Sequence, residues 1–139
     1  MESYEDKVVC SLVEDTRVIA YVASSTSLVE EARNLHHTSP VATAALGRAL
    51  TLAGIMGIEL KEGQKLTLHI RCWGPLESIL VQANSQGEIR GYVAQPSVFL
   101  PSREDKKLNV EEAVGKGSQL SVIKDLGVGE PYAGYIEMP

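Results

Sequence analysis

Few side chains in this 139-residue sequence have types that do chemistry, and Cys72 with His69 is the first pair to test. Residues three apart on a strand point to opposite faces, so this thiol and this imidazole do not form a nucleophile and its base. Cys72 shares its predicted face with leucine and isoleucine and is expected to be an inert core thiol. Cys10 lies in an apolar run and receives the same interpretation. Two cysteines and three histidines at these spacings do not make a zinc site.

The stretch Gly115-Lys116-Gly117-Ser118 has part of the composition of a phosphate-binding loop. Such a loop needs an earlier glycine where Val110 stands, and it precedes a helix, whereas a strand is predicted here. A helix stop followed by a turn is the preferred interpretation.

Two further polar features have structural explanations. His36 and His37 lie at a predicted helix end, where imidazoles can meet free carbonyls. Arg48 is the lone charge on an apolar helix, and it either reaches solvent or pairs with a carboxylate such as Glu59 or Asp125. Since no acid–base pair, activated nucleophile or ligand set is assembled, we predict no catalytic residue, no metal site and no enzymatic activity.

Composition narrows the class of protein and its surroundings. The formal charge is −5 and the basic residues are scattered, which disfavours nucleic acid as a partner. The acidic start lacks a secretory signal pattern, and two cysteines suit a reducing cytoplasm. Residues 40–58 are long enough to span a membrane, but Arg48 alone costs about 3 kcal/mol at its centre. We therefore expect a buried helix and no membrane contact.

The first half of the chain predicts a hairpin followed by two helices. Residues 7–13 and 17–23 are apolar on both faces, so both strands are expected to be covered. Ser27 and Glu30 have the spacing of a capping box for a helix to His36, with Leu28, Ala32 and Leu35 facing inward. Ser39 and Pro40 begin a helix rich in alanine and glycine. We expect it to be shielded on every side, with another backbone close to its glycines.

The second half predicts an antiparallel meander. Residues 65–73 alternate cleanly between apolar and polar, and strands at 78–84 and 89–94 follow after short turns. Asn109 is predicted to cap a short helix, and two more strands are expected at 119–125 and 132–138. The predicted class is therefore α+β, one domain over residues 1–139, with an N-terminal hairpin and a meander packed around the buried alanine/glycine-rich central helix.

Several ordered motifs resemble the heat-shock protein 33 family, the redox-regulated 33 kDa chaperonins. They occur at residues 29–33, 38–50, 91–94, 113–117 and 122–127. The resemblance implies a cytoplasmic, ATP-independent holdase that binds unfolding polypeptides under oxidative stress. It also implies, for the family, a C-terminal domain that binds zinc through four cysteines, which oxidation converts to disulfides.

This sequence reaches Pro139 without those zinc cysteines. We therefore expect the N-terminal core domain, which binds substrate and dimerises, in truncated form, without the zinc-binding domain and without a cofactor. Uncovered sheet edges pair with other chains, so homodimers, including strand-exchanged ones, are expected. Val98, Phe99 and Leu100 form an apolar cluster between prolines. This cluster is a candidate client-binding patch, with packing against the rest of a longer protein as the alternative.

Two other functions stay open at this point. One is an enzyme that uses Cys72 as a thiolate or binds a small ligand, which a low thiol pKa would favour. The other is a structural or small-ligand-binding α+β module without chaperone activity.

Overall fold

Seven strands and three helices make up residues 5–139, the part of the chain that the computed structural model describes. The α+β prediction is confirmed. Residues 1–4, on which the expectation of no secretory signal partly rests, lie outside this part. The elements are β1 (Lys7–Leu12), β2 (Ile19–Ser24), α1 (Thr26–His36), α2 (Pro40–Gly57), β3 (Lys65–Arg71), β4 (Ser78–Asn84), β5 (Ile89–Val93), α3 (Val110–Val114), β6 (Gln119–Asp125) and β7 (Tyr132–Glu137).

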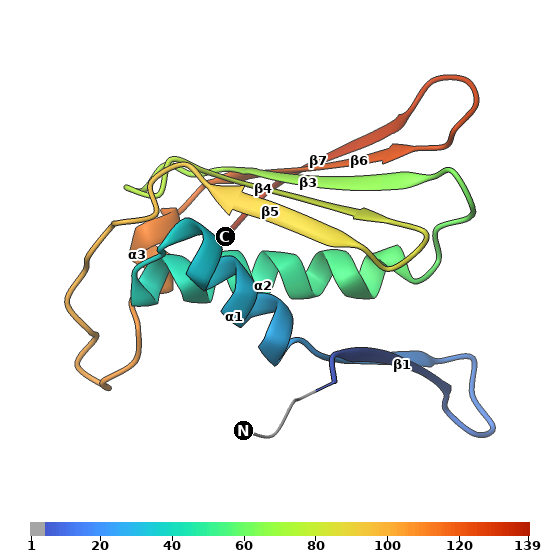
Figure 1. The fold of residues 1–139 in the computed structure, drawn as a ribbon, viewed down its shortest axis with the longest axis horizontal. Coiled ribbons are helices and arrows are strands. Elements are labelled where there is room, and N and C mark those ends of the chain that lie inside the picture. Colours follow the sequence, from blue (N-terminus) through green and yellow to red (C-terminus); the bar gives the residue numbers. More distant parts are fainter. Residues whose placement is uncertain (1–4) are drawn as a thin grey trace.

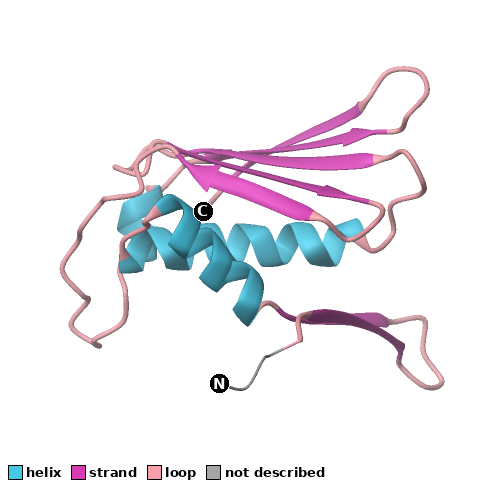
Figure 2. Ribbon diagram, viewed as in Figure 1, coloured by secondary structure: helices cyan, strands magenta, loops and turns pink. Residues whose placement is uncertain are grey.

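Five of the strands form one antiparallel sheet in the order β5-β4-β3-β6-β7 (Figure 1). The predicted meander is its first half, and β6 joins the meander along the free side of β3. Leu68 shows the register, since it lies opposite Val81 of β4 and Val122 of β6. Alternate residues of β3 are buried as predicted, because one face of the sheet lies on a helix (Figure 2).

The core lies between this sheet and α2. The small residues Ala42, Ala45, Ala49 and Ala53 are buried, and so are Leu46 and Leu50. α2 packs under β3, β4 and β5 and also contacts α1 and α3. The predicted narrow alanine face is thus confirmed. It lets the helix axis approach the sheet closely while the two leucines fill the space beside it.

The expectation that α2 is shielded on every side is wrong. Arg48, Leu52 and Met56 are exposed along the face that points away from the sheet. By length and composition α2 is apolar enough to cross a membrane, but half of it is buried inside the protein. One sheet and one crossing helix cover only part of a helix surface, which accounts for the open face. The atoms nearest to its glycines belong to side chains rather than to another backbone: a Cβ on Gly47 would lie 2.9 Å from Val29 Cγ1, and one on Gly57 would lie 3.2 Å from Ala83 Cβ.

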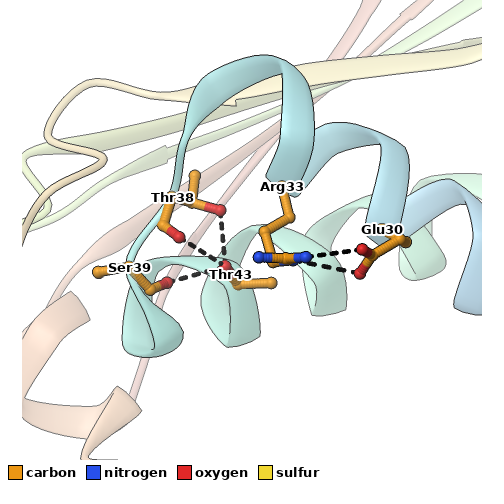
Figure 3. Close-up of polar contacts among 5 residues, drawn as sticks. All are labelled: Glu30, Arg33, Thr38, Ser39 and Thr43. Carbon is orange, nitrogen blue, oxygen red and sulfur yellow. Dashed lines mark hydrogen bonds and ion pairs between the residues drawn. The ribbon is translucent and has the colours of Figure 1, made fainter.

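The junction between α1 and α2 is tied by hydroxyl groups (Figure 3). Ser39 is the N-cap of α2 as predicted, and its Oγ accepts a hydrogen bond from Ala42 N at 3.3 Å. The Thr43 hydroxyl lies 2.6 Å from that of Thr38 and donates to the carbonyl of Ser39. On α1, Arg33 and Glu30 form an exposed ion pair at 2.7 Å. The hydroxyl contacts of Thr38, Ser39 and Thr43 stabilise the sharp turn between α1 and α2.

The start of α1 is built differently from the predicted capping box. The helix begins at Thr26, and the N-cap residue Ser25 makes no side-chain cap hydrogen bond. The Asp6 carboxylate accepts instead from the backbone N–H groups of Ser27 (3.1 Å) and Leu28 (2.6 Å). A carboxylate at the positive end of a helix dipole satisfies free donors, so a residue distant in sequence performs the cap's role. Leu35, expected inside, is 68% exposed.

The N-terminal hairpin, β1 with β2, lies on the side of α2 opposite the large sheet (Figure 1). Both strands were predicted to be covered, and this is wrong, because most of their residues are exposed. Cys10 is likewise exposed rather than a core thiol. Apolar side chains on both faces made the strands look internal, yet only the C-terminal part of α2 packs on them. Polar contacts hold the hairpin: the Tyr21 hydroxyl donates to Glu59, and Ser25 Oγ lies 2.6 Å from Thr51 Oγ1.

Candidate functional site

Cys72 follows β3 and is buried, as predicted for a core thiol. Its burial raises the pKa of the thiol to about 11, so almost no thiolate exists at neutral pH. The Cys72 Sγ–H donates to the Ile70 carbonyl at 3.8 Å, a weak hydrogen bond. An enzyme that depends on a Cys72 thiolate is not supported by this environment.

Gly115 to Ser118 form a helix stop and a turn into β6, as predicted, and not a loop that leads into a helix. Ser118 is fully buried, and its Oγ accepts from Trp73 N at 3.0 Å and donates to the Val114 and Gly115 carbonyls. Gly74 crosses this turn so closely that a Cβ there would lie 2.5 Å from the Ala113 carbonyl oxygen. The Gly115 and Gly117 N–H groups donate to the Glu111 and Met138 carbonyls, so these two amides are not free to bind a phosphate.

Arg48 is exposed on the outer face of α2. Among residues 5–139, neither Glu59 nor Asp125 pairs with it, so the solvent alternative is correct. It borders a shallow groove of about 620 Å³ whose other walls are largely apolar, among them Val29, Leu52 and Ile55. A second, more enclosed cavity of about 410 Å³ lies between the N-terminal hairpin, α2 and the β4–β5 turn. Walls of this composition bind apolar groups without orienting a reaction.

The predicted patch at Val98, Phe99 and Leu100 is split by the structure. Phe99 is 80% exposed, whereas Val98 and Leu100 are partly buried against the core. Ser39 fixes the segment from two sides, since its N–H donates to the Pro96 carbonyl (2.8 Å) and its hydroxyl to the Val98 carbonyl. Alternate residues of an extended segment point in opposite directions, so the Phe99 ring points outward from a backbone that Ser39 holds in place.

Large apolar side chains are also exposed on both hairpins, which the search for catalytic residues missed. In the N-terminal hairpin they are Val9, Leu12, Val13, Val18, Ile19 and Val22. In the C-terminal hairpin, β6 with β7, they are Leu126, Val128, Tyr132, Tyr135 and Ile136. For the N-terminal hairpin the sequence signal was present, because residues 7–13 and 17–23 are apolar on both faces, but it was interpreted as internal packing. For the C-terminal hairpin only the two strands were predicted, and nothing was predicted about their exposure.

No group of three or more histidine, cysteine or acidic side chains lies close enough to hold a metal ion within residues 5–139. The two cysteines are on different sides of the molecule's core, one exposed on β1 and the other buried after β3. Neither fits a four-cysteine zinc site. What the described surface offers is therefore exposed apolar area on an ordered scaffold.

Comparison with known proteins gives a consistent set of relatives. A profile of the family described as Hsp33 protein matches residues 6–139. The chain is 45% identical over 134 residues to the 33 kDa chaperonin of Desulforamulus reducens, covering 96% of this chain and 45% of that protein. It is 43% identical to the 33 kDa chaperonin of Bacillus subtilis, covering 96% and 46%.

A solved structure agrees with these relatives. The crystal structure of the 33 kDa chaperonin from Thermotoga maritima superposes with a TM-score of 0.87 at 36% identity. The match covers 94% of this chain and 44% of that one. The chain thus spans somewhat under half the length of the relatives it matches.

Proposed function

Since the chain belongs to the Hsp33 family, we propose that it is the client-holding part of an ATP-independent molecular chaperone. It binds unfolding polypeptides through exposed apolar side chains and prevents their aggregation. Its relatives bear the name 33 kDa chaperonin, and it shares their fold over the matched region.

One observation carries the proposal: apolar side chains are exposed at several places on a scaffold with a well-packed core. Exposed apolar surface marks sites of contact with other proteins, because burying it there lowers the free energy of association. The Phe99 loop, residues 95–109, and the two hairpins each supply such side chains from a different element. Distributed, chemically simple contacts suit a protein that takes many different clients.

The experiment is suppression of aggregation of a heat-unfolded client, followed by light scattering with increasing amounts of the 139-residue chain. We expect suppression without ATP. Phe99→Ser is expected to raise the amount of chain needed for half suppression about threefold, as one exposed ring among several contacts is lost. Leu35→Ser is the matched control, since Leu35 is also a single exposed apolar side chain, on α1.

Each result of this experiment has a distinct meaning. A wild-type chain that suppresses no aggregation contradicts the holdase function and favours a structural module. If Phe99→Ser and Leu35→Ser weaken suppression equally, the client-binding role of the patch at Val98, Phe99 and Leu100 is wrong. The holdase function then stands.

Further properties follow from the family and belong to the same proposal. Each strand of the two-stranded N-terminal sheet has a free edge, which supports a homodimer, including a strand-exchanged form. A cytoplasmic location accords with few cysteines and an acidic chain. Light scattering that shows only monomer across micromolar concentrations would count against the dimer. Activation by oxidation and zinc binding are assigned to no residue of this chain, because residues 5–139 hold no suitable ligand set.

A further inference from the structure

We propose that β7 is a docking edge at which an extended, apolar segment of a non-native protein, flanked by basic residues, adds as a sixth strand of the large sheet. The inference rests on the proposed function and names the chemistry of one client-binding site. It concerns a surface separate from the patch at Val98, Phe99 and Leu100.

β7 is the last strand of the sheet, paired on one side with β6 and with no strand on its other side among residues 5–139. An outer strand presents unpaired N–H and C=O groups that template the pairing of a further strand. Toward its turn, the hairpin that carries β7 splays away from the rest of the sheet, on the side away from α2 (Figure 1). The backbone hydrogen bonds that form there do not depend on the client's sequence.

The side chains of β7 add apolar contacts on both faces of the edge. Tyr132 and Ile136 share the face on which β6 places Leu120 and Val122, yet they are 63% and 57% exposed. Tyr135, on the opposite face, is 75% exposed. Cross-strand pairs that involve aromatic side chains stabilise the pairing of two strands. A strand with alternating apolar residues therefore finds partners whichever face it turns toward them.

Inside β7 the features that usually prevent such pairing are few, because Pro131 precedes the strand and Glu137 is its last residue. Within Tyr132–Glu137 there is no proline, lysine or arginine. The opposite edge strand, β5, carries Arg90, whose guanidinium donates to Gln82 at 2.8 Å, and two of its apolar residues pack on the core. A basic side chain on an edge discourages association, and β5 carries Arg90, whereas the charged residue of β7 is the acidic Glu137 at its end.

Charge favours a basic client over a second copy of this chain. β7 ends with Glu137, Glu130 precedes Pro131 at its start, and the net charge is −5. β7 itself carries no basic residue, and Lys124 lies one strand inward, opposite Tyr132. Two β7 strands paired antiparallel would bring the acidic ends of both copies together, whereas lysine or arginine beside an apolar segment is attracted to them.

The test uses the 139-residue chain and a fluorescein-labelled peptide with a six-residue alternating valine–threonine core and two lysines at each end. Fluorescence anisotropy measures its affinity. Tyr135→Lys, which puts a charge on the edge, is expected to weaken binding about tenfold. Tyr92→Lys is the control, since it makes the same change at an exposed tyrosine on β5. Circular dichroism and thermal unfolding check that both variants remain folded.

Two altered peptides separate the two parts of the inference. A peptide with glutamate in place of every lysine is expected to bind about tenfold more weakly at low salt, and the difference shrinks as salt is added. A peptide with proline at alternate core positions cannot pair its backbone and is expected not to bind. Equal binding of either altered peptide would overturn the proposal.

The same variants in the aggregation assay distinguish this inference from the proposed function. If Tyr135→Lys and Tyr92→Lys bind the peptide equally while the wild-type chain suppresses aggregation, the docking edge is wrong and the holdase function stands. If the chain does not suppress aggregation but Tyr135→Lys alone loses the peptide, the edge stands and the holdase function fails. If Tyr135→Lys abolishes self-association and the wild-type chain binds no peptide, the occupant is a second copy and the proposal is overturned.

Discussion

β5 and β7 are the two outer strands of one sheet, and their surroundings differ. Under β5 lie α1 and α2, so Ile89 and Val93 pack on the core. β7 carries apolar residues in a similar alternation, yet Tyr132 and Ile136 stay largely exposed. Strand sequence alone did not decide burial. Position relative to α2 did, because a side chain is buried only where another element faces it.

The difference separates stability from binding within one sheet. The half formed by β3, β4 and β5 has buried alternate side chains and supplies the core with α2. The half formed by β6 and β7 projects past this support and keeps apolar surface available (Figure 1). A rigid half that positions an uncovered half is a physical arrangement suited to holding other chains.

The largest expected effect compares a leucine under β5 with an isoleucine on β7. Leu50→Ala removes a fully buried side chain and is expected to lower the free energy of unfolding by about 2–5 kcal/mol. Ile136→Ala, at a site 57% exposed, is expected to cost below about 1 kcal/mol. Urea denaturation measures both. Equal losses would mean that β7 is packed in solution and would remove the contrast.

A second pair of changes tests the glycines of the same two strands. A Cβ on Gly91 would lie 2.4 Å from Val81 Cγ1 and 2.8 Å from the Leu80 carbonyl oxygen, so Gly91→Ala is expected to cost about 1–3 kcal/mol. A Cβ on Gly134 meets its nearest atom, in Tyr132, at 3.5 Å, and Gly134→Ala is expected to change stability by less than about 0.5 kcal/mol. Thermal unfolding of both variants is the measurement. A harmless Gly91→Ala would show that β5 and β4 are less closely packed than described.

A third, smaller effect concerns how the N-terminal hairpin is held. Asp6→Ala removes the carboxylate that accepts from the first N–H groups of α1, and a loss of about 1 kcal/mol is expected. Glu5→Ala is the control, since that exposed neighbour makes no such contact. Faster hydrogen exchange at Ser27 and Leu28 in Asp6→Ala would locate the effect. Unchanged exchange there would show that the cap is not supplied by Asp6.

The last prediction involves no loss of stability at neutral pH and compares the two thiols. At pH 8, Ellman's reagent is expected to react quickly with exposed Cys10 and slowly with Cys72, since burial raises the pKa of Cys72 to about 11. Cys10→Ser removes the fast phase. The Cys72 thiol binds its proton more tightly in the folded state than in the unfolded state, where its pKa is near 9. Its contribution to the free energy of unfolding is therefore complete below pH 9 and is lost as the pH rises through about 11. If Cys72 reacted with Ellman's reagent as fast as Cys10, an enzyme that uses the Cys72 thiolate would again be a candidate function.

Most of the fold followed from local patterns. The strands at 78–84 and 119–125, the Ser39 cap and the Asn109 cap depend on neighbours within a few residues, and all agree with the structure. Exposure of the N-terminal hairpin did not follow, because a run that is apolar on both faces has the same sequence pattern whether or not another element covers it. The capping role of Asp6 was also beyond local reasoning, since it acts 21 residues away from Ser27.

The candidate site was predicted only in part. Phe99 was singled out and is exposed, but its neighbours Val98 and Leu100 turn inward, and an extended segment's direction depends on the contacts that Ser39 makes with it. The position of β7 at the edge of the sheet could be predicted only with knowledge of the strand order. Sequence placed β7 last along the chain, whereas its position at the border of the sheet depends on β6 pairing with β3.

That pairing also has a consequence for synthesis on the ribosome. β3 leaves the exit tunnel with β4 and β5 close behind, but β6, its other neighbour, begins about 50 residues after β3 ends. At typical elongation rates this interval lasts several seconds, far longer than a hairpin needs to form. The nascent chain therefore passes through a three-stranded stage in which β3 is an outer strand with unpaired backbone groups, until β6 emerges and pairs with it.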